Sequence, residues 1–195
     1  MRQNDLYVNA FDRRPRGKGI FFYWTVLALV FLAAALASYA LTPAAHSSVV
    51  AQALRNKAFL GQFKFILGLQ PAWMMLAIWV KNMIVALLLL TIGGYLGGLV
   101  SYLVIVFNAV VLGVLVKTLH ASGATFRFVL AGLLPHGIIE LSAIFLAGAL
   151  AIWAVQRQLR FSRRLTGGLR WVAPLLLVAA AIETFVTPLV MAHFR

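Results

Sequence analysis

The chain has 195 residues, of which 63% are hydrophobic and 11% are charged, whereas soluble domains average about 25% charged residues. So few charges could not cover so much apolar surface in water, which excludes a soluble globular fold and predicts a single all-α domain in a lipid bilayer. Cysteine is absent, which excludes disulfides and cysteine-ligated metals. Basic segments flank the apolar runs, so contact with anionic lipid explains the net charge of +13, and we predict no nucleic-acid binding.

The N-terminal part predicts a tail, a first transmembrane helix and an interfacial segment. Residues 1–19 carry five basic residues with Pro15 and two glycines, and we interpret them as a basic cytoplasmic tail. Residues 20–41 are long enough to cross the membrane and longer than the roughly 7–15 apolar residues of a signal peptide, so we predict a retained helix. Residues 42–70 are amphipathic and mildly basic, which predicts a helix lying in the interface.

Two further helices are predicted at 72–92 and 99–116, separated by the segment Gly93-Gly94-Tyr95-Leu96-Gly97-Gly98. Four glycines within six residues permit a tight hairpin between the two helices. The spacing of Gly93 and Gly97 is equally typical of a small-residue packing face between membrane helices. Both interpretations stay open at this point.

The last two predicted helices, 127–155 and 171–192, complete a bundle of five transmembrane helices within a domain of residues 20–192. The segment between them, 156–170, is strongly basic, and we predict that it lies on the lipid surface through Arg157, Arg160, Arg163 and Arg164. The tail and this segment hold five basic residues each, against six on the opposite side. The positive-inside rule therefore predicts a multi-pass membrane protein with a cytoplasmic N-terminus.

Polar residues recur near the centres of four predicted helices. They are Lys81 and Asn82, Asn108, Glu140 and Glu183, with His136 four residues before Glu140. A charge at the centre of a lipid-facing helix costs about 2.5–3.5 kcal/mol, so we predict that these side chains converge in one intramembrane layer. Pro135 and Gly137 predict a break in the fourth helix beside this layer. A functional site and a structural polar network remain equally compatible with the pattern.

The sequence offers no signature of an enzyme. His136-x-x-x-Glu140 is not the His-Glu-x-x-His zinc motif, and a zinc site needs three protein ligands where this helix provides two. No nucleophile elbow or phosphate-binding loop is present. We therefore predict no catalytic residues, no cofactor and no metal.

The segment Leu133-Leu134-Pro135-His136-Gly137-Ile138-Ile139-Glu140 resembles the hallmark of the stage II sporulation protein M family, whose members carry Leu-Pro-His-Gly-x-x-Glu in a late transmembrane helix. Lys81-Asn82 stands where that family usually has paired asparagines, and Ala181–Pro188 is similar to its closing helix. The resemblance implies a five-helix bundle in the plasma (inner) membrane. In endospore formers it implies a scaffold for peptidoglycan-degrading partners, and the family also occurs in organisms that never sporulate.

Two functions follow as hypotheses. The first is a non-enzymatic membrane scaffold or assembly factor with membrane or cell-envelope protein partners, either as a single copy or as an oligomer. The second is a small transporter or proton-coupled channel that uses the polar layer.

Overall fold

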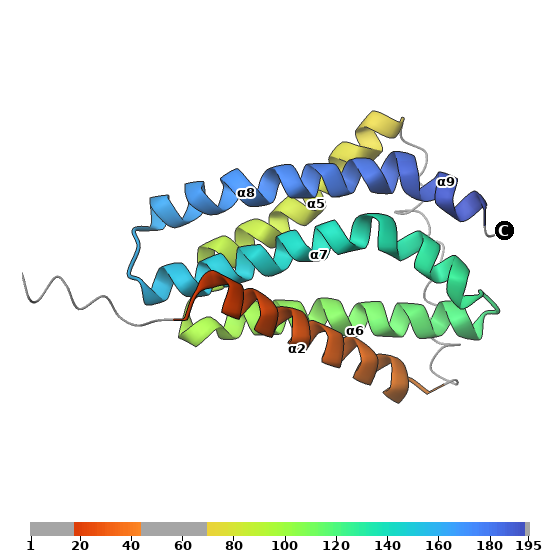
Figure 1. Ribbon diagram of the computed structural model, residues 1–195, viewed down its shortest axis with the longest axis horizontal. Helices are drawn as coiled ribbons and strands as arrows, with labels where there is room; N and C mark the ends of the chain where they lie inside the picture. Colours follow the sequence, from red (N-terminus) through yellow and green to blue (C-terminus); the bar gives the residue numbers. More distant parts are fainter. Residues whose placement is uncertain (1–17, 44–69, 194–195) are drawn as a thin grey trace, which may run out of the picture.

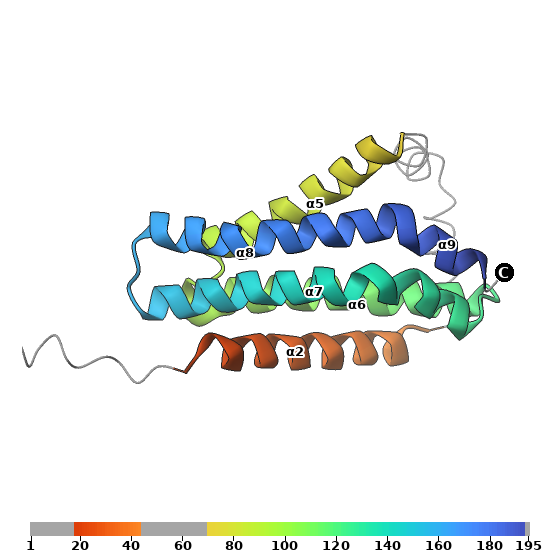
Figure 2. The same cartoon turned by 45° about the horizontal axis from the view of Figure 1, so that its top comes forward.

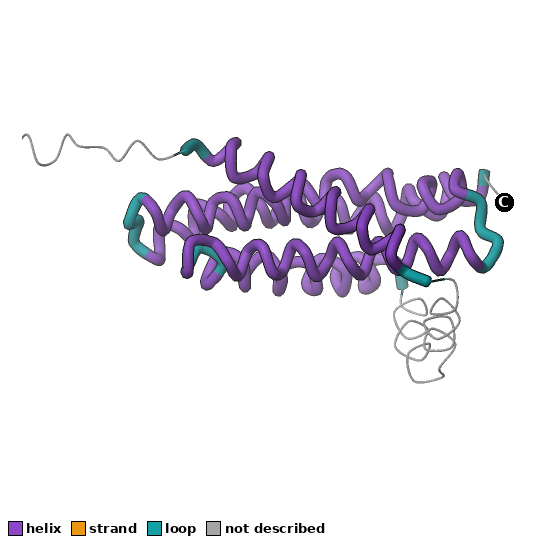
Figure 3. The backbone as a smooth tube through the Cα atoms, turned by 90° about the horizontal axis from the view of Figure 1, so that it is seen from below, coloured by secondary structure: helices purple, strands orange, loops and turns teal. Residues whose placement is uncertain are grey.

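The computed structural model describes residues 18–43 and 70–193 (Figure 1). Within these ranges the chain is helix and short loops, without strands (Figure 3). Five of the described helices are long and apolar enough to cross a membrane, which confirms the predicted fold class. Most of the predicted tail and of the interfacial segment 42–70 lies outside the described residues.

Successive long helices run in opposite directions, and short connections join α5 to α6, α6 to α7 and α7 to α8 (Figure 1). In chain order they are α2 (Ile20–Leu41), α5 (Pro71–Ile92), the short 3₁₀ turn η1 (Leu96–Gly98), α6 (Leu99–Ala121), α7 (Phe126–Gln156), α8 (Phe161–Ala181), the π-helix η2 (Ile182–Val186) and α9 (Thr187–Ala192). The last three run on without a loop, so that Phe161–Ala192 forms one membrane-spanning rod. The predicted bounds of the first, second and fourth helices agree within one residue, and the third runs five residues further.

The start of the fifth helix was predicted wrongly. Residues 161–170, assigned to the lipid surface, form the first turns of α8. Leu165, Leu169, Val172 and Leu176 recur every three or four residues, and they form one stripe that is partly or fully buried against the bundle. This stripe continues the membrane helix into the basic segment.

Helix α7 forms the centre of the bundle, with α2, α5, α6 and α8 packed around it (Figures 1 and 2). The C-terminal half of α7 is rich in buried small residues: Ala143, Ala147, Gly148, Ala149, Ala151 and Ala154. Small side chains let neighbouring helix backbones approach closely, which is how membrane helices associate without a hydrophobic driving force between them.

The glycine segment forms the tight hairpin between α5 and α6. Gly97 and Gly98 have φ values of 68° and 94°, which glycine adopts at little cost. Gly94 lies so close to α7 that a Cβ atom there would collide with the backbone oxygen of Ala151. The hairpin interpretation is therefore correct. Gly94 does pack closely on α7, but the backbone at Gly97 is not helical and a Cβ atom there would meet nothing within 4 Å, so Gly93 and Gly97 do not form a helix packing face.

The bundle has two unlike halves. We call the half that contains the α5–α6 hairpin and the α7–α8 connection the packed half, and the half that contains the start of α5, η2 and α9 the open half. In the packed half, Tyr23 Oη donates a hydrogen bond to Gln156 Oε1 at 2.6 Å, which ties α2 to α7. In the open half, the N-terminal part of α5 leans away from the rod that α8, η2 and α9 form (Figure 2).

Candidate functional site

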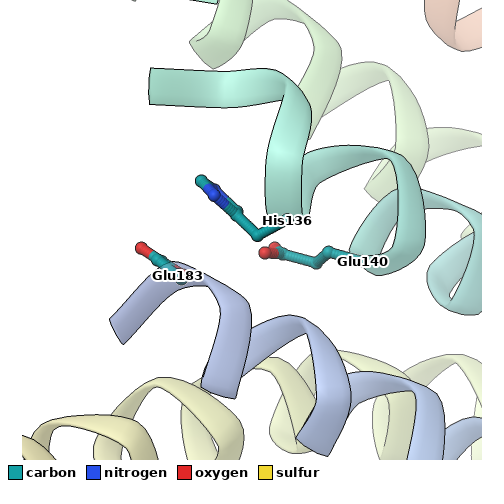
Figure 4. Close-up of side chains that lie close together, drawn as sticks. All are labelled: His136, Glu140 and Glu183. Carbon is teal, nitrogen blue, oxygen red and sulfur yellow. The ribbon is translucent and has the colours of Figure 1, made fainter. Parts of the chain in front are cut away.

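Three polar side chains meet between α7 and η2. His136 and Glu140 extend from α7 and Glu183 from η2, and one potential ligand atom from each residue lies within 4.8 Å of the others (Figure 4). All three side chains are half-buried. The predicted convergence is confirmed for these three residues, and we call them the His–Glu–Glu cluster.

The local structure of α7 explains why His136 and Glu140 point the same way. Residues four apart share one face of an α-helix, about 6 Å apart along its axis. Pro135 lies inside the helix, which continues from Phe126 to Gln156, so the predicted break at Pro135 and Gly137 is wrong. Proline removes one backbone hydrogen bond and bends a helix, and surrounding helices hold this turn together.

Glu183 is presented by the π-helix η2, an element that the sequence analysis missed. The backbone N–H of Thr187 bonds to the carbonyl of Ile182, five residues earlier, and the Thr187 hydroxyl donates to the same carbonyl at 3.2 Å. Isolated π-turns inside α-helices occur frequently at functional sites. Pro188 is the available sequence signal, because it cannot donate the backbone bond that would continue a regular helix.

Thr187 also contacts His136. The distance from His136 Nδ1 to Thr187 Oγ1 is 3.1 Å, and which group donates depends on the tautomer of the ring. When the Thr187 hydroxyl donates to the carbonyl of Ile182, its oxygen accepts from Nδ1–H. In that neutral tautomer Nε2 keeps its lone pair.

Lys81 and Asn82 of α5 border the cluster from a third helix. The charge of Lys81 lies within electrostatic reach of both Glu140 and Glu183, yet its side chain is exposed. Asn82 is 3% exposed and lies beside Glu140, while its Nδ2 has no hydrogen-bond partner in the described part of the chain.

Asn108 is not part of the site, so the prediction of one layer across four helices is wrong. Its side chain is exposed and donates to the carbonyl of Val104 in its own helix at 2.8 Å. Helix α6 packs mainly against α2, and Asn108 is not among the side chains that meet in the cluster. The longer fifth helix also moves its midpoint to about Leu176, so Glu183 lies toward its C-terminal end.

The basic residues assigned to the lipid surface divide into two groups. Arg160 and Arg163 are exposed, and Arg157 lies over the ring of Trp153 at 5.5 Å. Arg164 is 5% exposed, so its assignment to the surface was wrong. Its guanidinium donates a hydrogen bond to the carbonyl oxygen of Thr91 at 2.5 Å. The carbonyls of the last turn of a helix have no partner within the helix, so Arg164 caps the C-terminal end of α5.

Comparison with known sequences supports the resemblance carried by the Pro-His-Gly segment. The family described as stage II sporulation protein M matches residues 20–188, which includes every described transmembrane helix at least in part. Neither the curated proteins nor the solved structures that were compared contain a match to this chain.

Proposed function

Because the chain belongs to the stage II sporulation protein M family, we propose that it is a non-enzymatic membrane scaffold that binds a partner through the exposed face of α5. The observation that carries the proposal is Lys81, a charged residue exposed at the middle of a transmembrane helix. It lies in a shallow groove along α5 whose other lining residues are apolar: Trp73, Leu76, Ala77, Val80 and Ile84.

The position of Lys81 in the membrane makes its charge energetically costly. Helix α5 has 22 residues, and Lys81 stands halfway along it, about 15 Å from either end. A lysine side chain cannot reach the aqueous interface over that distance, and a lipid-facing lysine at this depth costs about 2.5–3.5 kcal/mol. Glu140 and Glu183 lie within electrostatic reach of Lys81 and offset part of that cost, and a partner carboxylate at the same depth would offset the rest.

The chemistry of this chain favours a different protein as the partner over a second copy. Only four acidic residues occur in the sequence: Asp5 and Asp12 near the N-terminus, and Glu140 and Glu183 in the membrane. Both membrane carboxylates belong to the His–Glu–Glu cluster, so a second copy has none to spare for Lys81. We therefore propose a membrane or cell-envelope partner with a transmembrane helix that carries Asp or Glu, in a plasma membrane where this chain keeps its N-terminus in the cytoplasm.

Site-specific photocrosslinking in native membranes tests this proposal. A photoreactive residue in place of Val80 should capture one heterologous membrane protein, whereas the same residue in place of Phe107, exposed on α6, should not. Lys81→Glu should abolish the product, and replacement of the partner's membrane acid by lysine should restore it. Capture of a second copy alone, or equal capture at both positions, would contradict the proposal.

A small transporter or proton-coupled channel is the second candidate, because three titratable side chains converge at membrane depth. Purified protein in liposomes would then show a flux driven by a pH gradient that Glu140→Gln abolishes. Asn108→Leu is the control, since Asn108 lies apart from the cluster. Absence of flux across a panel of ions and small solutes would exclude this candidate.

A further inference from the structure

The His–Glu–Glu cluster has the composition and placement of a metal site. We propose that His136, Glu140 and Glu183 bind one divalent transition-metal ion, with Zn²⁺ as the best-matched ion, between α7 and η2. This inference does not depend on the scaffold proposal.

The three ligand atoms already lie near the spacing that a metal ion requires. Bonds from Zn²⁺ to histidine nitrogen and carboxylate oxygen measure about 2.0–2.2 Å, so ligand atoms around one ion lie up to about 4 Å apart. In this structure all three fall within 4.8 Å of one another. Around a tetrahedral Zn²⁺ ion the ligand atoms lie about 3.4 Å apart, so side-chain adjustments of up to about 1.5 Å would bring them to bonding distance. The close-up in Figure 4 shows the three side chains directed toward a common space.

The hydrogen bonds around His136 are those of a metal ligand. Metal-binding histidines almost always donate their second ring N–H to a neighbouring acceptor, which fixes the tautomer and orients the ring. Thr187 provides that acceptor when its hydroxyl donates to the carbonyl of Ile182. In that tautomer Nε2 of His136 is free to coordinate the ion.

Asn82 lies beside the cluster and faces one of its carboxylates. Its buried amide is close enough to Glu140 to interact with that carboxylate, yet Nδ2 makes no hydrogen bond of normal length and angle in the described residues. Leaving a buried amide donor without a full hydrogen bond costs free energy. A carboxylate oxygen of Glu140 turned by coordination, or a water molecule on the metal ion, would complete this bond.

Charge neutrality favours an ion as well. When both carboxylates are ionised and the histidine is neutral, the cluster carries two negative charges, which a divalent cation would cancel at membrane depth. Lys81 could cancel one of them. The mixed nitrogen and oxygen ligands, together with the absence of cysteine, favour Zn²⁺ over soft Cu⁺ and over Mg²⁺ or Ca²⁺, which prefer oxygen alone.

The test is metal binding by the full-length protein in nanodiscs. After chelation and dialysis, Zn²⁺ should bind at one ion per chain by elemental analysis and raise the thermal stability of the wild type. Co²⁺ should produce the visible absorption of a site with nitrogen and oxygen ligands. Glu183→Gln should weaken Zn²⁺ binding by at least ~100-fold, because one of three ligands is lost.

Matched variants separate coordination from general destabilisation. His136→Asn should abolish binding while His120→Asn, at an exposed histidine near the end of α6, should not. Thr187→Val should weaken binding about 10–100-fold, as expected for a residue that orients a metal ligand. Thr118→Val is its control, since Thr118 is equally buried and bonds only to Val114 in its own helix.

Lys81→Gln gives the sharpest contrast, because removal of a nearby cation should tighten Zn²⁺ binding. The proposal is overturned if wild-type protein binds no Zn²⁺ in excess of His136→Asn, or if Zn²⁺ fails to raise the stability of the wild type. If the photoreactive residue at position 80 captures no partner while Zn²⁺ still binds, the scaffold proposal is contradicted and the metal-site proposal is not.

Discussion

The two halves of the bundle differ in how closely their helices pack and in how regular their backbone is. In the packed half, small residues of α7 bring the helices together, and two side-chain hydrogen bonds link neighbouring helices: Tyr23 bonds to Gln156, and Arg164 to Thr91. In the open half, α7 carries a proline, η2 replaces a regular turn and α5 diverges. The polar cluster lies in this open half.

The difference shows where the fold gains stability and where it places reactive groups. A proline inside a helix and a π-turn both weaken the backbone hydrogen bonding, and they persist where the surrounding structure holds them in place. In this chain, close helix contacts at one end supply that support. The other end can then present half-buried histidine and carboxylate groups.

The largest expected difference in stability is between substitutions at two glycines of α7. A Cβ atom at Gly148 would lie 2.9 Å from Leu27 Cδ1, whereas one at Gly137 would have nothing within 4 Å. Gly148→Leu should therefore lower the free energy of unfolding by about 3 kcal/mol, and Gly137→Leu should leave it nearly unchanged. Unfolding by denaturant in micelles measures both, and equal losses would show that the halves are packed alike.

A smaller effect is expected at two neighbouring arginines of α8. Arg164 is buried and bonded to Thr91, and it also lies over the rings of Tyr95 and Phe161. Arg164→Ala should cost about 2 kcal/mol, because a charge-assisted bond to a helix end is lost. Arg163→Ala, at an exposed position, should change stability by less than about 0.5 kcal/mol. A similar cost for both would mean that Arg164 does not hold the end of α5.

The bond between Tyr23 and Gln156 tests the contact of α2 with α7. Tyr23→Phe should cost about 1 kcal/mol, the usual net value of one hydrogen bond between neutral groups. A double-mutant cycle with Gln156→Met provides the control, since the second substitution should add little once the first has removed the bond. Fully additive losses would contradict the contact.

The smallest effect is expected at Asn108. Its side chain bonds only within α6, so Asn108→Leu should change the free energy of unfolding by no more than about 0.5 kcal/mol. Zn²⁺ binding should be unchanged. A marked loss of either stability or Zn²⁺ binding would show that Asn108 does contribute to the polar site.

Much of the fold could be predicted from the sequence, because helix length and apolar runs respond to the thickness of the bilayer. The first helix was predicted at its observed bounds, and the glycine hairpin from its composition. The fifth helix was cut short, since its basic first turns resemble a surface segment. Only packing reveals that Leu165 and Leu169 continue the buried stripe of α8.

The site was predictable in part. The i, i+4 spacing predicted that His136 and Glu140 share a helix face, and the cost of a lipid-facing charge predicted that Glu183 lies beside them. Position along a helix says nothing about which face a residue occupies relative to its neighbours, so Asn108 was included wrongly. The role of Thr187 depends on a π-turn that periodicity alone does not reveal, and the third potential metal ligand comes from a different helix than the first two.

The most direct test of the account is whether α7 and η2 bring residues 136 and 183 together in the native membrane. The chain contains no cysteine, so introduced pairs are the only thiols. A short bifunctional thiol reagent should bridge the pair His136→Cys and Glu183→Cys, which protects both from later labelling by a bulky maleimide. The pair Asn108→Cys and Glu183→Cys should stay open to labelling. Equal labelling of the two pairs would contradict the convergence on which the site depends.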